Sequence, residues 1–177
     1  MAKCWFLFGL YYAKIVVFAF CTLVSGADYA RIRQGHGRYG TVLYTYIFRE
    51  NALRRGDGFY GTVLYTLTDE NDQRCIRRGS GSYGTVAYTY TANDDRLRQG
   101  SGSYGKALFT YERGRTPFIH RGDGNYGTTV CTLDYSDDVI YVRRGSGSYG
   151  TVIATIENGD EVPKAMLTFI AAILLCN

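Results

Sequence analysis

The sequence predicts an all-β protein built as a six-repeat β-solenoid, and three observations carry this prediction. A Gly-x-Gly-x-Tyr-Gly core occurs six times, and the copies begin at Gly35, Gly56, Gly79, Gly100, Gly122 and Gly145. Successive copies are 21, 23, 21, 22 and 23 residues apart, a repetition typical of solenoids and hairpin arrays. The 177 residues include 17 tyrosines and 22 glycines, a composition that favours strands joined by turns.

Each repeat is expected to contain a short strand, a Gly-x-Gly bend and a longer strand. An apolar residue and a cationic residue precede the glycines, as in Ile32-Arg33. A run rich in Tyr, Thr and Val follows them, as from Tyr39 to Tyr46. Joints rich in Asp and Asn, such as residues 69–72, are predicted turns because both side chains bond their own backbone and tolerate left-handed geometry.

Two arrangements of these repeats satisfy the pattern. In a β-solenoid each repeat is one coil, and like residues stack about 4.8 Å apart. The recurring tyrosines would then form a stacked aromatic ladder. In the alternative, an antiparallel β-hairpin repeat meander, like residues lie two strands apart and the strands must curl or close. We take the solenoid as the leading prediction.

The repeats resemble those of the bacterial curli fibre subunit. The residues that carry this resemblance are of the type Arg143-Arg144-Gly145-Ser146-Gly147-Ser148, and it covers roughly residues 32–156. It rests on the period and on the Gly-x-Gly spacing. Arg, Tyr and Thr stand where curli has internal Gln and Asn ladders. The resemblance therefore implies the coil geometry of a β-solenoid and not a shared function.

Three segments are predicted along the chain. Residues 1–27 combine Lys3 and Lys14 with an apolar run and a small-residue end, as in a secretory signal peptide. Residues 28–160 hold the six repeats, and residues 161–177 form an apolar tail. That tail is either a cap on the open end of the last repeat or a glycosylphosphatidylinositol-type signal. We expect an extracellular protein, or a lipid-anchored one at the cell surface, so membrane contact depends on the tail.

Charge and cysteine content argue against nucleic-acid binding and against a disulfide framework. Loss of Lys3 and Lys14 with the signal reduces the net charge from +4 to +2, which removes the main support for nucleic-acid binding. Of five cysteines, only Cys75 and Cys131 lie in the repeats. They stand at non-equivalent positions, so we expect two unpaired thiols, with a single bridge as the alternative.

The sequence predicts no enzyme, no cofactor and no metal site. The two histidines, His36 and His120, lie at different places in their repeats, and His120 substitutes for a repeat arginine. The carboxylates concentrate in the predicted turns, where a solvated role is expected. No nucleophile, base and acid recur in a constellation suited to catalysis.

The recurring polar and aromatic residues are the candidate binding surface. They are Tyr39, Tyr60, Tyr83, Tyr104, Tyr126 and Tyr149, Arg33, Arg54, Arg77, Arg98 and Arg143, and Thr45, Thr66, Thr89, Thr110, Thr132 and Thr155. Two functions follow from a flat face of this kind. The first is a secreted structural protein that associates with itself, end to end or by its edges, into a fibre, coat or matrix. The second is a monomeric module that binds a polysaccharide or another repetitive polymer.

Overall fold

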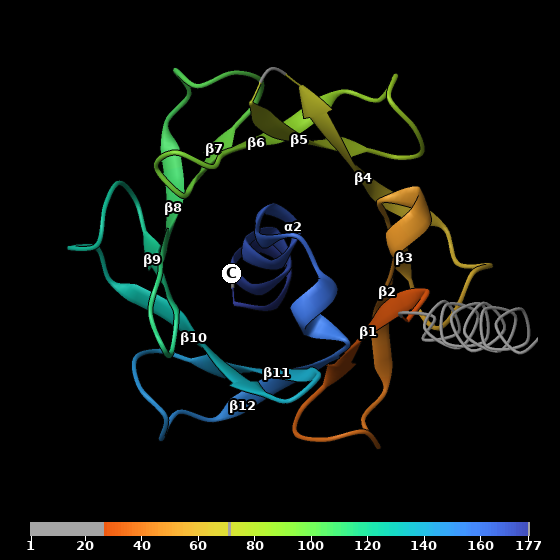
Figure 1. Ribbon diagram of the computed structural model, residues 1–177, viewed down its shortest axis with the longest axis vertical. Coiled ribbons are helices and arrows are strands. Elements are labelled where there is room, and N and C mark those ends of the chain that lie inside the picture. Colours follow the sequence, from red (N-terminus) through yellow and green to blue (C-terminus); the bar gives the residue numbers. More distant parts are fainter. Residues whose placement is uncertain (1–26, 71, 177) are drawn as a thin grey trace, which may run out of the picture.

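A computed structural model describes residues 27–70 and 72–176, which form a closed antiparallel barrel around a helical segment (Figure 1). The predicted signal peptide lies outside the described residues except for Ala27. The strands are β1 Tyr29–Gln34, β2 Val42–Ile47, β3 Ala52–Arg55, β4 Val63–Glu70, β5 Gln73–Arg78, β6 Val86–Thr91, β7 Arg96–Gln99, β8 Ala107–Glu112, β9 Phe118–Arg121, β10 Thr129–Ser136, β11 Val139–Arg144 and β12 Val152–Glu157.

The fold is all-β, but it is a twelve-stranded closed barrel and not a solenoid. Each strand pairs with its neighbours in sequence, and β1 pairs with β12, where Ile32 lies opposite Ile156. Like residues of successive repeats therefore lie two strands apart. The reason is local: four of the turns contain a left-handed Asn or Asp that reverses the chain within a few residues. These residues are Asn51, Asp72, Asp95 and Asp137, with φ between 49° and 62°.

Each repeat supplies two strands joined by a glycine-rich loop that points away from the barrel (Figure 1). We call these six loops the petals; they are residues 35–41, 56–62, 79–85, 100–106, 122–128 and 145–151. The end of the barrel that carries them is the petal rim, and the opposite end is the turn rim. The turn rim also holds two 3₁₀ turns, η1 Phe48–Glu50 and η2 Gly159–Glu161.

The petals end later than the sequence pattern predicts. The β-favouring run starts at Tyr39 in the sequence, yet β2 starts at Val42. The register between β1 and β2 also shifts after Ile32, which is the mark of a β-bulge. A Cβ on Gly40 would lie 2.0 Å from the Gln34 carbonyl oxygen. Only glycine therefore allows the backbone at the end of the petal to pass this close to the end of β1.

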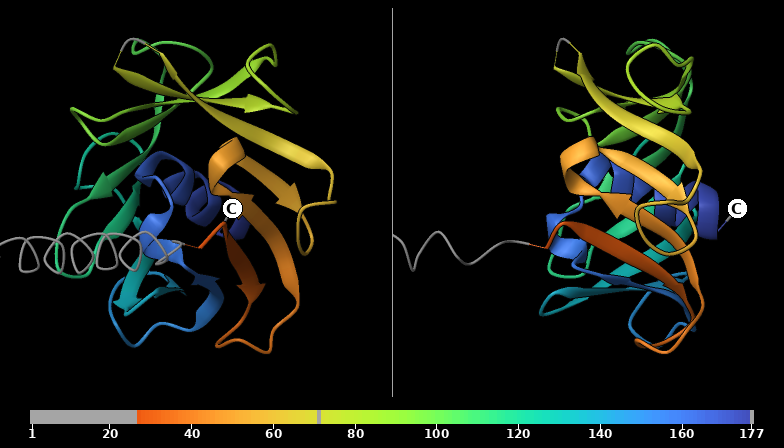
Figure 2. Two further views of the ribbon diagram at one scale, coloured as in Figure 1. Left: turned by 45° about the vertical axis from the view of Figure 1, so that its right-hand side comes forward. Right: turned by 90° about the vertical axis from the view of Figure 1, so that its right-hand side faces the viewer.

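The apolar tail lies inside the barrel (Figure 2). It forms α2 Lys164–Phe169 and a π-helical turn η3 Ile170–Leu175, which run from the turn rim to the petal rim. Residues 165–172 are buried, and Phe169 packs against Tyr65 and Tyr88 with ring centroids 4.6 and 5.2 Å away. No helix within the described residues has the length and apolar character needed to cross a membrane.

The cysteines of the repeats are free thiols. Cys131 faces the lumen, and a hydrogen bond with Cys176, together with burial, raises the pKa of its thiol. This contact joins the end of the helical segment to β10. Cys75 is buried on β5, and burial raises the pKa of its thiol too.

Candidate binding surface: the six petals

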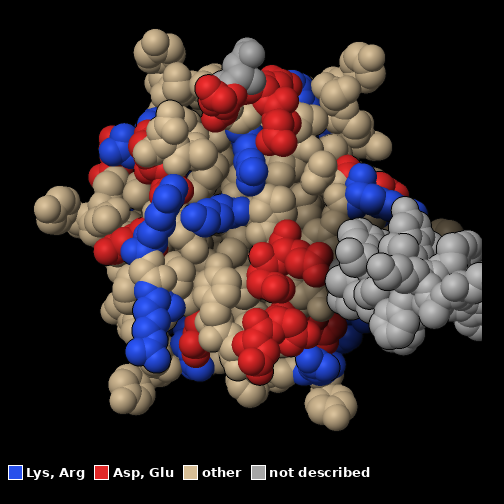
Figure 3. Space-filling view, in the orientation of Figure 1, with Lys and Arg blue, Asp and Glu red and all other residues tan. Residues whose placement is uncertain are grey.

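The tips of the petals carry the recurring tyrosines, whose exposed fractions are close to complete. These are Tyr39 at 103%, Tyr60 at 102%, Tyr83 at 100%, Tyr104 at 102%, Tyr126 at 105% and Tyr149 at 104%. Rings exposed to this degree do not stack, so the expected aromatic ladder is wrong. Figure 3 shows uncharged groups projecting at the outline of the molecule, while acidic and basic side chains intermix on the face seen there.

The recurring threonines lie beneath the petals and hold them. Thr45 donates a hydrogen bond from Oγ1 to the Gly56 carbonyl at 2.7 Å and accepts one from the Gly58 amide at 3.1 Å. Each threonine thus joins its own hairpin to the petal of the next repeat. The same pair of bonds is made by Thr66, Thr89, Thr110, Thr132 and Thr155.

Burial removes these threonines from the predicted binding face. All six are buried, with exposed fractions of 0–6%. Thr155 closes the circle, because its hydroxyl holds Gly35 and Gly37 of the first petal. The threonines consequently fix the orientation of the petals and do not contact solvent.

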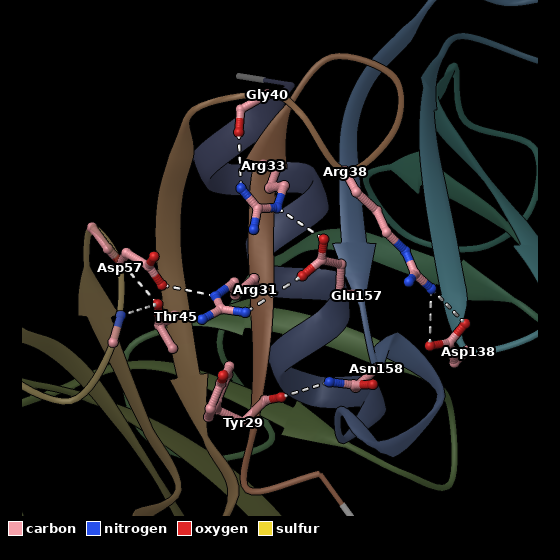
Figure 4. Close-up of polar contacts among 12 residues, drawn as sticks. Tyr29, Arg31, Arg33, Arg38, Gly40, Thr45, Asp57, Asp138, Glu157 and Asn158 are labelled. Carbon is pink, nitrogen blue, oxygen red and sulfur yellow. Dashed lines mark hydrogen bonds and ion pairs between the residues drawn. The ribbon is translucent and has the colours of Figure 1, made fainter.

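The recurring arginines form an outer row that supports the petals from the barrel wall. Arg54 donates from Nη1 to the Gly61 carbonyl at 2.8 Å and from Nη2 to Glu50 at 2.7 Å. Figure 4 shows the equivalent contacts of Arg33 with Gly40 and Glu157, at 3.0 and 2.9 Å. Each guanidinium therefore satisfies a petal carbonyl and a carboxylate together.

Every member of the outer row has a carboxylate partner. The pairs are Arg33 with Glu157, Arg54 with Glu50, Arg77 with Glu70, Arg98 with Asp94, His120 with Glu112 and Arg143 with Asp134. His120 takes the place of an arginine in this row and makes the same two kinds of contact. Its Nδ1 lies 3.1 Å from the Gly127 carbonyl oxygen, and its Nε2 lies 2.6 Å from a Glu112 carboxylate oxygen. The hydrogen bond from Arg77 lowers the pKa of Glu70.

An inner row of polar residues was missed by the sequence analysis. It follows the outer row by one residue and comprises Gln34, Arg55, Arg78, Gln99, Arg121 and Arg144, all exposed. Arg121 lies opposite Phe109 in the β8–β9 register, and Arg144 lies opposite Cys131 in the β10–β11 register. Because directly paired residues share a face of the sheet, this row points to the lumen. The Arg-Arg, Arg-Gln and His-Arg pairs before the Gly-x-Gly copies were the available signal.

The described residues hold no group of three or more His, Cys, Asp or Glu side chains placed to bind a metal ion. Of the recurring tyrosines, threonines and outer-row residues of the described barrel, only the tyrosines are fully exposed.

Comparison with known proteins gives one match. Residues 22–136 match the model of a family described as 6-fold beta flower protein. Neither the curated proteins nor the solved structures contain a match to the chain, and no curli-type match is found. The matched region spans more than half of the 177 residues. The chain therefore belongs to the 6-fold beta flower protein family.

Proposed function

We propose that the protein is a non-enzymatic, extracellular binding module that presents six tyrosine-tipped petals to a polysaccharide. The observation that carries the proposal is the near-complete exposure of all six tip tyrosines. Large apolar side chains at this exposure gain nothing for the fold, whereas aromatic rings with one polar group are favoured in binding surfaces.

The recurring glycines, threonines and outer-row arginines have structural tasks, which sets the tyrosines apart from them. Gly35 and Gly37 adopt φ of 75° and 88°, a conformation that L-residues avoid. Thr45 and Arg54 bond the backbone of a petal. A tyrosine kept at the same position in all six copies without such a task is best explained by contact with a partner.

Six equivalent tips suit a partner that repeats. A polysaccharide offers many copies of one sugar face, and a flat tyrosine ring with a hydroxyl at its edge matches an apolar face surrounded by polar groups. Each single contact is weak. Engagement of several tips by one polymer raises the overall affinity through effective concentration, by about 10²–10⁴-fold.

Self-association by strand addition, one route to the fibre expected from the sequence, has less support in this arrangement. All twelve strands of the described barrel have partners on both sides, and a closed barrel lacks the unpaired edge that templates strand addition. The binding module is therefore the function that the geometry favours.

Cosedimentation with insoluble polysaccharides tests the proposal. The wild-type protein should bind at least one member of a panel of cellulose, chitin, xylan and β-1,3-glucan. A variant with all six tip tyrosines replaced by serine should lose this binding but keep its melting temperature, because the rings contact nothing. Tyr135→Ser, which removes a 40% exposed tyrosine near the turn rim, is the control and should bind normally.

Two results would contradict the proposal. One is equal binding by the six-serine variant and the wild type. The other is the assembly of purified wild-type protein into fibrils with a spacing of about 4.7–4.8 Å, which would support the structural alternative.

A further inference from the structure

We propose that the petal-side mouth of the barrel is a second site, which binds a small organic carboxylate with an apolar body, of the fatty-acid type. This site is separate from the tyrosine tips and does not depend on the proposed function. It rests on the inner row of residues, on an adjacent cavity and on the end of the helical segment.

The inner row points into the barrel. Arg55 pairs directly with Tyr44, and Arg78 pairs directly with Tyr65. Both tyrosines pack against the core inside the barrel. Since directly opposite residues of an antiparallel pair lie on one face, the two arginines point inward at the petal rim. Arg121 follows the same rule, and its guanidinium carbon lies 5.9 Å from the centre of the Phe109 ring.

The outer and inner rows differ in whether their charges are paired. All six members of the outer row lie within 4.0 Å of a carboxylate oxygen. Within residues 27–70 and 72–176, the inner arginines make no ion pair, and neither does Lys106. Five cations thus converge on the mouth: Arg55, Arg78, Lys106, Arg121 and Arg144. Like charges held together without acids repel one another, and an anionic ligand relieves that repulsion.

A cavity of about 370 Å³ lies in this mouth. Its polar wall contains Lys106, Arg121 and Gln99, and its apolar wall contains Leu108 and Ile173 with aromatic rings of β6 and β8. The volume falls in the range of about 300–1,000 Å³ that small-molecule sites occupy. Beyond the cavity, the helix ends with half-buried Leu174 and Leu175, which extend the apolar surface.

These features together indicate the chemical class of the ligand. Lys106 and Arg121 supply charged donors for a carboxylate, and Gln99 supplies a neutral one. The apolar wall accepts a hydrocarbon chain and excludes a fully hydrated anion such as inorganic phosphate from the deeper part of the cavity. A carboxylate with a chain of medium length satisfies both walls.

Isothermal titration calorimetry with dodecanoate, below its micellar concentration, tests this site. The wild-type chain should bind dodecanoate and should bind dodecanol at least about tenfold more weakly, because the alcohol lacks the charge. Lys106→Gln combined with Arg121→Gln should weaken dodecanoate binding by about tenfold or more. Both side chains are exposed, so the melting temperature of the variant should match that of the wild type.

Arg115→Gln is the matched control, since it removes one exposed cation in the loop between β8 and β9 at the turn rim. It should leave dodecanoate binding unchanged. The proposal is overturned if the wild type does not bind dodecanoate, if dodecanol binds as tightly as dodecanoate, or if the double variant binds like the wild type. The six-serine petal variant should still bind dodecanoate, which separates failure of this site from failure of the proposed function.

Discussion

A threonine hydroxyl connects each hairpin to the petal beside it, and the network of these hydroxyls makes the repeats interdependent. Each Oγ1 serves as donor and acceptor for two backbone groups of the neighbouring petal. The hydroxyls are buried, so water does not readily replace a hydrogen bond that a substitution removes. Removal of one hydroxyl leaves a carbonyl and an amide without partners.

Thr89→Val should therefore destabilise the protein by about 1–3 kcal/mol. The variant keeps the shape of the side chain but loses the bonds to Gly100 and Gly102. Thr91→Val is the matched control on the same strand, because the buried Thr91 hydroxyl has no partner in the described barrel; it should be neutral or slightly stabilising. Urea unfolding of both variants checks the prediction, and equal losses would contradict it.

Asp95 links stability to pH. Burial raises the pKa of this carboxyl, but the hydrogen bonds from Arg113 and Tyr90 outweigh burial and leave the pKa below the ordinary value of 3.8. A carboxyl with a lowered pKa stabilises the fold above its ordinary pKa and loses that contribution as the pH falls through the folded value.

Asp95→Asn should accordingly reduce stability by about 1 kcal/mol at pH 7, a modest loss because the Arg113 side chain is 61% exposed. Asparagine tolerates the left-handed backbone of this position, where φ is 52°. Thermal melts from pH 7 to pH 2 should show the gap between wild type and variant closing below about pH 4. A gap that is constant across this range would exclude the ion pair as its source.

The roles of single residues were only partly predictable. The sequence identified the recurring Thr45 and Arg33 positions but assigned both to an outer binding face. The error has a physical origin: Thr45 pairs directly with Arg54 and so lies on the outer face of the sheet, but the petal of the next repeat covers it. Which segment covers a strand depends on the assembled barrel and leaves no simple local mark in the sequence.

At the scale of elements, the helical segment in the lumen takes the place of a packed sheet interior. A ring of twelve strands encloses more space than its own side chains fill, and α2 with η3 occupies that space. Phe169 is fully buried against two tyrosines of the wall. We therefore expect the tail to be part of the folding unit.

Phe169→Ala should destabilise the protein by about 3–5 kcal/mol, because it leaves a cavity at the centre of the barrel. Thr168→Val, one residue earlier, should have little effect, since the buried Thr168 hydroxyl makes no hydrogen bond within the described barrel. Calorimetric melting temperatures compare the two. Similar melting temperatures for Phe169→Ala and the wild type would mean that the segment does not support the barrel.

The elements themselves were largely predictable, and their assembly was not. Two strands per repeat and turns at the Asp-rich joints follow from local composition, and both are present. The tail was expected outside the repeats, as a cap or an anchor signal, and it lies inside them. Its apolar character was visible in the sequence. The space that receives it exists only once the ring has closed.

At the scale of the whole molecule, closure of the barrel sets the positions of the petals, the inner row and the tip tyrosines. It brings Thr155 of the last repeat to the first petal, aligns six inner residues around one mouth and directs six tyrosines outward. Six near-identical repeats are compatible with parallel coils and with antiparallel hairpins, because both bury the same residue types. The pairing of β1 with β12 joins residues 120–126 positions apart in the sequence, and no local sequence pattern predicts it.

The most direct test of closure is nuclear Overhauser spectroscopy on isotopically labelled protein. The barrel predicts cross-strand contacts that connect Ile32 with Ile156 and Arg31 with Glu157, at the distances of an antiparallel pair. Absence of these contacts, with in-register parallel contacts between successive repeats in their place, would contradict the closed barrel.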